Sequence, residues 1–201
     1  MQRFPNPGCQ NFKLCQMRVL PIFLALCSLG YIFGCSKNNS AQELIPIPNG
    51  DFENWNGMPI LDLWRTNSCP VCASPDDRYI VIKDSTSYQG QFAAKFIRRV
   101  SNSWADNKFA VSTYPTNLLA YVKTNLPGVD SVSIGIELFK NMSLIGSGKW
   151  VGTSSISNYT LINIPVSTNT IVPDSAFIRI VGGKGANSEF WVDHLVLLKQ
   201  E

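Results

Sequence analysis

One segment, residues 131–140, alternates apolar and polar side chains without a break and restricts the fold more than any other. Its apolar positions would share the inner face of a strand: Val132, Ile134, Ile136 and Leu138. Its outward positions are Ser133, Gly135, Glu137 and Phe139. Similar segments recur, separated by Gly, Pro and Asn turns, at 79–84, 91–100, 118–123, 159–166, 176–181 and 190–199. This spacing, with no convincing amphipathic helix, predicts an all-β sandwich of antiparallel sheets.

Three local assignments complete this prediction. Residues 101–108 are polar around Trp104 and are predicted as a loop. Asn141-Met142 is predicted as the turn that follows the alternating segment. Residues 118–123 are compatible with a strand, and a helical turn remains possible there.

The N-terminal region predicts export. Arg18 precedes an apolar run, 19–33, of about 15 residues, which is short for a membrane span of about 20. A signal peptide is therefore the better interpretation. The residues before Met17 are untypical of such a leader and favour translation from Met17, with a long leader as the alternative. We predict that residues 1–34 are the leader.

Cys35 is predicted to carry a lipid. The sequence Ile32-Phe33-Gly34-Cys35 resembles the bacterial lipobox, in which a small residue precedes the modified cysteine. Residues 35–43 would then be the lipidated cysteine and a polar, flexible tether, with the domain at 44–201. Ser36 in place of Asp favours the outer membrane of a Gram-negative bacterium, and the leaflet stays open. A cysteine that merely ends an ordinary signal peptide is the alternative.

The charge distribution excludes one class of partner. Arg3, Lys13 and Arg18 precede Cys35, so of 17 basic residues 14 remain from Cys35 onward, against 14 acidic ones. The exported chain is therefore neutral and has no basic run. A nucleic-acid surface needs a clustered basic patch, so we expect no nucleic-acid partner.

Three motifs appear in an order typical of one group of proteins. They are Asn-Gly-Asp-Phe-Glu-Asn-Trp at 49–55, Ser-Tyr-Gln-Gly-Gln-Phe-Ala-Ala-Lys-Phe at 87–96, and Phe-Trp-Val-Asp-His-Leu at 190–195. Residues 44–199 thus resemble the galactose-binding-like jelly rolls, which include many carbohydrate-binding modules. They also resemble the carbohydrate-metabolism domains of outer-membrane lipoproteins. His194 departs from the pattern, because a second Asp usually stands there.

The resemblance implies a jelly-roll β-sandwich whose first and last segments meet, and glycan binding by analogy. It also implies a structural calcium ion, which takes six to eight hard oxygen ligands. Glu53 and Asp193 match the ligand motif, and Asp51 and the carbonyl of Gly90 match it more weakly. The alternative is that both carboxylates accept hydrogen bonds from loop amides without a metal.

Two further groups of residues are predicted to be structural. Cys69 and Cys72 form a CxxC motif without the βαβ setting of a thioredoxin or the four ligands of a zinc site. In an exported protein a loop disulfide is expected, with a disulfide donor or a metal site as alternatives. Strand alternation places His194 and Asp193 on opposite faces, so they form no catalytic dyad.

Exposed aromatic rings next to polar groups are the best sugar-binding candidates, because a flat ring stacks on a sugar face. Trp104 and Trp150 lie in polar surroundings, and Arg98, Glu137 and Arg179 project from strands. We expect the other tryptophans to pack in the core or at its edge: Trp55, Trp64 and Trp191.

The favoured function is a non-catalytic, lipid-anchored carbohydrate-binding module at the cell envelope. It would have the membrane, a polysaccharide and envelope proteins as partners. A structural or protein-interaction lipoprotein without a glycan site is the alternative. A glycan hydrolase is a more distant one, because nothing in the sequence pairs the carboxylates of Asp76, Asp77 and Glu137.

Overall fold

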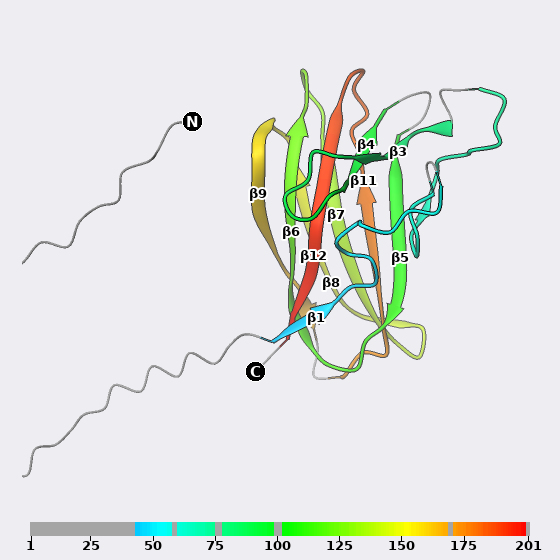
Figure 1. Ribbon diagram of the computed structural model, residues 1–201. Helices are drawn as coiled ribbons and strands as arrows, with labels where there is room; N and C mark the ends of the chain where they lie inside the picture. The colour runs from blue at the N-terminus through cyan, green and yellow to red at the C-terminus, as the bar shows by residue number, and fades with distance from the viewer. Residues whose placement is uncertain (1–42, 58–59, 75–77, 99–101, 169–170, 200–201) are drawn as a thin grey trace, which may run out of the picture. The chain divides into compact units, whose positions relative to one another are not determined.

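Two antiparallel β-sheets lie face to face in the computed structural model of this chain (Figure 1). The structure describes residues 43–57, 60–74, 78–98, 102–168 and 171–199. The leader, Cys35, the tether up to residue 42 and the Asp76-Asp77 pair lie outside these ranges. Within them, no helix has the length and apolar character that a membrane span requires.

The first sheet has the strand order β3-β4-β12-β6-β9. In addition, β1 pairs with residues 196–198 of β12. Its strands are β1 (Leu44–Pro46), β3 (Val81–Asp84), β4 (Ala93–Ile97), β6 (Pro115–Asn125), β9 (Ile156–Pro165) and β12 (Glu189–Lys199). The strand β6 settles the assignment of residues 118–123, which are extended and not helical.

The second sheet has the order β10-β8-β7-β11-β5-β2. Its strands are β2 (Arg65–Thr66), β5 (Trp104–Ala110), β7 (Val132–Lys140), β8 (Ser143–Gly152), β10 (Ser167–Thr168) and β11 (Ser175–Val181). Each pairing within both sheets is antiparallel. The predicted all-β jelly-roll sandwich is confirmed.

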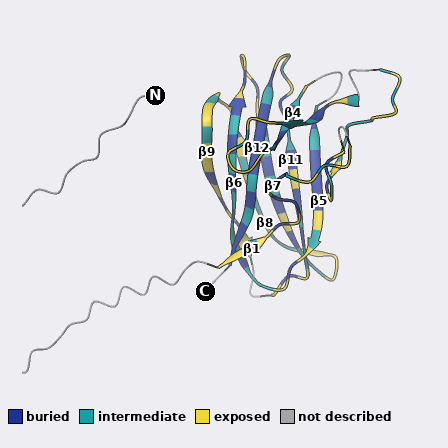
Figure 2. Cartoon of the chain, in the orientation of Figure 1, coloured by how far each residue is buried: buried dark blue, intermediate teal, exposed yellow. Residues whose placement is uncertain are grey.

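The core lies between the sheets, where Figure 2 shows buried residues along the strands of both layers. The alternation of β7 is as predicted: Ile134 and Ile136 are almost fully buried, whereas Glu137 is exposed. Burying one such aliphatic side chain stabilises the fold by about 1.5–3 kcal/mol. The turn at Asn141-Met142 is also confirmed, since both residues adopt positive φ angles between β7 and β8.

The prediction of a loop at 101–108 is wrong, because residues from Trp104 onward form β5. Asp106 and Asn107 are buried, and their polar groups find partners far away in the sequence. Arg65 donates to both carboxylate oxygens of Asp106 at 2.9 Å, and the Asn107 amide donates to the Pro48 carbonyl. These distant partners satisfy polar side chains that would otherwise favour a loop.

The first and last segments of the sandwich meet, as expected. Leu44 pairs with Leu198, and the Leu195 amide donates to the Gly50 carbonyl at 2.7 Å. Gly50 is required there, because a Cβ atom would lie 2.6 Å from the Leu195 oxygen. The side chain of Phe52, two residues after Gly50, is fully buried in the core.

A β-bulge interrupts β12 at His194, which has a φ of 50°. Asp193 pairs with Tyr121 and Val196 with Leu119, so three steps on β12 match two on β6. The prediction that Asp193 and His194 occupy opposite faces is wrong for this reason. The ring centroids of His194 and Tyr121 are 6.2 Å apart. On the same side of the sheet, the Asp193 carboxylate accepts a hydrogen bond from the amide of Tyr88.

Candidate functional site

A groove of about 650 Å³ runs across the outer face of the second sheet. Strands β7, β8 and β11 supply its walls and floor. The groove is lined by Ser133, Gly135, Ile136, Glu137, Ser147, Gly148, Lys149, Phe177, Arg179 and Val181.

The register of the three strands explains the hollow. Gly135 on β7 stands opposite Lys149 on β8 and opposite Arg179 on β11. Because Gly135 has no side chain, the two long cationic side chains border an open floor. The groove therefore follows directly from a glycine at an outward position of a central strand.

The groove combines one aromatic ring with three charged groups. Phe177 is half-buried and stands opposite Glu137, one row along from Gly135. The side chains of Glu137, Lys149 and Arg179 are exposed, and none forms a salt bridge within the part of the chain that the structure describes. These groups can stack on an apolar ligand face and exchange hydrogen bonds with polar substituents.

Trp104 lies at the β5 side of the same face. The guanidinium of Arg179 is 5.1 Å from its ring centroid, and that of Arg65 is 5.6 Å. Asp106 hydrogen-bonds Arg65 and raises the pKa of its guanidinium, which therefore stays charged. The structure thus brings Trp104, Glu137 and Arg179 to one face, where Trp104 holds Arg179 in place by cation–π contact.

Two predicted ligand residues lie elsewhere. Trp150 stands opposite the inward-facing Ile134 and packs against Phe190, with ring centroids 6.2 Å apart. Its polar neighbours in the sequence misled the prediction, because alternate residues of β8 face opposite sides. Arg98 is exposed just beyond β4 and so belongs to the first sheet. Neither residue joins the groove.

Phe177 and Lys149 line the groove and were not predicted from the sequence. In the sequence, Phe177 is one apolar residue among several in 176–181. Its outward position follows only from the pairing of β11 with β7, where it stands opposite Glu137. A signal was present: Phe177 is two residues from Arg179, so both share a face of one strand. Lys149 likewise shares a face with Ser147 on β8.

The candidate calcium residues bind backbone amides. Glu53 Oε1 accepts hydrogen bonds from the amides of Gln91 at 2.8 Å and Phe92 at 3.0 Å. Asp193 Oδ2 accepts from Tyr88 and Gln89, and its Oδ1 accepts from the His194 amide. This is the metal-free arrangement that the sequence left open.

A small pocket of about 160 Å³ borders these groups, lined by Asp51, Glu53, Gln89, Gly90 and His194. Asp51 is exposed, and the Gly90 carbonyl accepts a hydrogen bond from the Ser87 hydroxyl. No three His, Cys, Asp or Glu residues of the described ranges come together as a metal site would require. Burial also raises the pKa of Asp193. Calcium binding at Glu53 and Asp193 stays a prediction.

A cluster of rings holds the loop before β4 on the first sheet. Tyr88 stacks on Tyr121 with ring centroids 3.4 Å apart, and the Tyr159 hydroxyl donates to the Thr86 carbonyl. Burial raises the pKa of Tyr159, so its hydroxyl remains protonated and can donate this bond. The cluster accounts for His194, whose imidazole packs beside Tyr88 and Tyr121.

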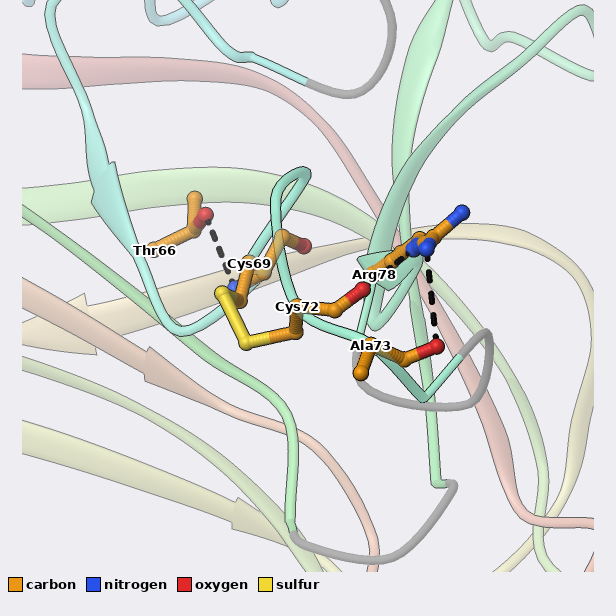
Figure 3. Close-up of a disulfide and its surroundings, with 6 residues drawn as sticks. Thr66, Cys69, Cys72, Ala73 and Arg78 are labelled. Carbon is orange, nitrogen blue, oxygen red and sulfur yellow. Dashed lines mark hydrogen bonds between the residues drawn. A yellow bond between two sulfur atoms is a disulfide. The ribbon is translucent and has the colours of Figure 1, made fainter.

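Cys69 and Cys72 form a disulfide within one short loop (Figure 3). Their Cα atoms are 5.4 Å apart, and the Arg78 side chain donates to the carbonyls of Cys72 and Ala73. The structure therefore places the cysteines in a closed loop that Arg78 ties to the chain before β3.

No protein-family model and no curated protein sequence matches this chain. Among solved structures it is similar to a Bacteroides thetaiotaomicron protein provisionally described as a glycoside hydrolase. The TM-score is 0.54 at 10% identity, over 74% of this chain but only 66% of that protein. A cyclase from Fischerella sp. TAU gives a TM-score of 0.50 at 11% identity, over 80% of this chain and 98% of the cyclase.

A carbohydrate-binding module named TmCBM61, in complex with β-1,4-galactotriose, is also similar, with a TM-score of 0.47 at 14% identity. The match covers 77% of this chain and 97% of the module. The first two likenesses, at 10% and 11% identity, establish the fold and leave the chemistry to the chain's own residues. The chain is a jelly-roll β-sandwich.

Proposed function

We propose that this chain is a non-catalytic glycan-binding module whose site is the groove on the outer face of the second sheet. The supporting observation is that Phe177, Glu137, Lys149 and Arg179 line one groove of about 650 Å³. A sugar ring has apolar C–H faces and a rim of hydroxyls. The first suits the Phe177 ring, and the second suits the charged side chains around it.

The carboxylates on this face favour binding over hydrolysis. Glycosidases generally place two carboxyl groups on either side of the bond that they cleave. Glu137 is the one carboxylate among the described residues that line the groove. Asp106 also faces outward on this sheet, but both of its oxygens are bound by Arg65. Glu137 would therefore accept hydrogen bonds from sugar hydroxyls.

A lipid on Cys35 would hold the module at the outer membrane of a Gram-negative cell. The lipobox-like sequence that ends at Cys35 supports this part of the proposal, and so does the polar stretch that separates it from β1. More than one acyl chain gives stable membrane attachment, whereas a single chain gives only marginal binding. Metabolic labelling with an alkyne-palmitate in the native host tests it, with Cys35→Ala as the variant. An equal label on both proteins would refute the anchor.

Affinity electrophoresis of residues 36–201 through gels containing plant, algal or microbial polysaccharides tests glycan binding. This segment contains the compact unit Ser40–Glu201. We expect retardation by at least one polysaccharide. Phe177→Ala should lose about tenfold in affinity, because stacking contributes about 0.5–1.5 kcal/mol in addition to the burial of the ring. Leu161→Ala removes an exposed apolar side chain from the first sheet and should bind normally.

The outcome also decides between functions. If no polysaccharide retards the protein, the glycan-binding proposal is wrong, and the structural or protein-interaction lipoprotein takes its place. If retarded polysaccharides acquire new reducing ends during incubation, without the unsaturated ends that a lyase leaves, the protein is a hydrolase. Both outcomes are independent of the lipid-anchor experiment, which tests only Cys35.

A further inference from the structure

We propose that the groove selects glycans that carry an anionic substituent, a carboxylate or a sulfate, and binds that anion between Arg179 and Lys149. This inference rests on the proposed function, since it names the class of sugar that the same groove would take. It arises from the order of three outward residues across neighbouring strands: Arg179 on β11, Gly135 on β7 and Lys149 on β8.

The spacing of this row suits one sugar substituent. Neighbouring strands lie about 4.8 Å apart, so the backbones of β11 and β8 are separated by roughly 10 Å across β7. The floor between them is Gly135, whose missing side chain leaves room for a ligand group. An ideal Cβ at Gly135 would have the Gly148 oxygen, at 3.8 Å, as its nearest neighbour, so the site is open above the backbone.

Both cations are available to a ligand. Neither Arg179 nor Lys149 has a carboxylate within 4.0 Å in the described part of the chain. Arg65, the other arginine near this face, already forms a salt bridge with Asp106. Arg179 also contacts the ring of Trp104, which restricts its side chain while its donors stay exposed. A restrained guanidinium loses less conformational entropy when it binds an anion.

Glu137 defines where the anion can sit. It stands two residues beyond Gly135, roughly 7 Å along β7, opposite Phe177 and Ser147. A second anion over this row would be repelled, whereas sugar hydroxyls can donate to the carboxylate. The groove therefore has a cationic half over Gly135 and a half with Phe177 and Glu137 that suits an uncharged sugar face.

Matched ligands test this inference. Residues 36–201 are titrated calorimetrically with polygalacturonate, alginate, hyaluronate and a sulfated galactan, and with the carboxyl-reduced or desulfated form of each. We expect at least one acidic polymer to bind about tenfold more tightly than its neutralised form, because a charge-assisted hydrogen bond contributes more than 1.4 kcal/mol. The sulfated galactan and the uronates distinguish the two anions.

Variants locate the effect. Arg179→Gln and Lys149→Gln should each remove most of the preference for the acidic form and its weakening by NaCl, and should weaken binding of the neutral form much less, because Gln still hydrogen-bonds hydroxyls. Lys184→Gln removes the same charge from an exposed side chain on the loop before β12 and should change nothing. Circular dichroism spectra check that each variant folds.

The results separate this inference from the proposed function. If acidic polymers bind no more tightly than their neutralised forms, or if the preference survives both charge substitutions, the inference is wrong. In that case binding that still depends on Phe177 leaves the glycan-binding proposal standing. If none of these polymers binds and no polysaccharide retards the protein in affinity electrophoresis, both are wrong.

Discussion

Asp193 and Tyr88 lie 105 residues apart in the sequence, yet the Asp193 carboxylate accepts a hydrogen bond from the Tyr88 amide at 2.7 Å. The same oxygen accepts from Gln89, and beyond Gly90 the Glu53 carboxylate accepts from the amides of Gln91 and Phe92. Two carboxylates from opposite ends of the domain thus fix the segment that leads into β4.

Asp193→Asn is expected to lower the free energy of unfolding by about 1.5–3 kcal/mol, because one acceptor oxygen becomes an NH2 group that faces amide donors. Asp51→Asn is the matched control, because Asp51 is exposed and its side chain forms no hydrogen bond with the part of the chain that the structure describes. Urea denaturation at pH 7 measures both. Equal midpoints for the two variants would show that the Asp193 contacts contribute nothing.

Two glycines with nearly the same φ angle isolate the contribution of Glu53. Gly90 has a φ of 77° and Gly128 a φ of 78°, but a Cβ at Gly90 would lie 2.1 Å from Glu53 Oε1, whereas Gly128 has open space. Gly128→Ala should cost about 1–2 kcal/mol of stability from backbone strain alone. Gly90→Ala should lower the stability by about 1 kcal/mol more than Gly128→Ala does, because the Glu53 carboxylate must move away from the amides of Gln91 and Phe92.

Thermal and urea unfolding of both alanine variants check this prediction. If the two variants are destabilised equally, the Glu53 carboxylate does not hold the amides of Gln91 and Phe92.

Thermal unfolding with and without EDTA tests the predicted calcium ion. A lower midpoint of the wild-type protein in EDTA, with no such change in Asp193→Asn, would support it. An unchanged wild-type midpoint would count against the ion.

The fold was predictable from the sequence where side chains alternate regularly. In β7 every second residue from Val132 to Leu138 is buried, as the pattern indicates. The pattern failed at β5, because the partners of Asp106 and Asn107 are remote in sequence. It failed also at His194, because a bulge shifts the alternation by one residue. Local periodicity contains neither kind of information.

A second buried carboxylate, that of Asp130, should make the stability of the protein depend on pH. Burial raises the pKa of Asp130, but hydrogen bonds from the Ser188 hydroxyl and from the amides of Lys184, Gly185 and Ser131 outweigh it and lower the pKa to about 2. A lowered pKa in the folded state means that Asp130 stabilises the protein above the unfolded value, 3.8, and that this contribution disappears as the pH falls toward 2.

Asp130→Asn should therefore be less stable than the wild-type protein at pH 7, by about 1–3 kcal/mol. The difference should shrink as the pH is lowered from 5 to 2.5. Urea unfolding across this range measures it. A difference between the two proteins that stays constant down to pH 2.5 would contradict the account of Asp130.

The disulfide between Cys69 and Cys72 should contribute little to stability. It closes a loop of only four residues, so it removes little entropy from the unfolded chain, and the double variant Cys69→Ser/Cys72→Ser should lose about 2 kcal/mol or less. Thermal melts of the wild-type protein with and without a reductant provide the parallel measurement. A loss of the folded transition on reduction would contradict this expectation.

The candidate site was only partly predictable. Glu137 and Arg179 were identified as outward-facing residues, and they do line one groove. The alignment of Gly135 between Lys149 and Arg179 depends on the register of β8, β7 and β11, which no single strand specifies. Trp150 shows the opposite error, because its polar neighbours suggested exposure whereas its own position faces the core.

The central claim is that a glycan binds in the groove of the second sheet. The most direct test is an NMR titration of isotope-labelled residues 36–201 with oligosaccharides of a polysaccharide that retards the protein. We predict saturable shifts concentrated on the amides of Gly135, Lys149, Phe177 and Arg179, with Tyr121 and Leu161 on the first sheet unmoved. Shifts confined to the first sheet, or spread evenly over both, would contradict the account.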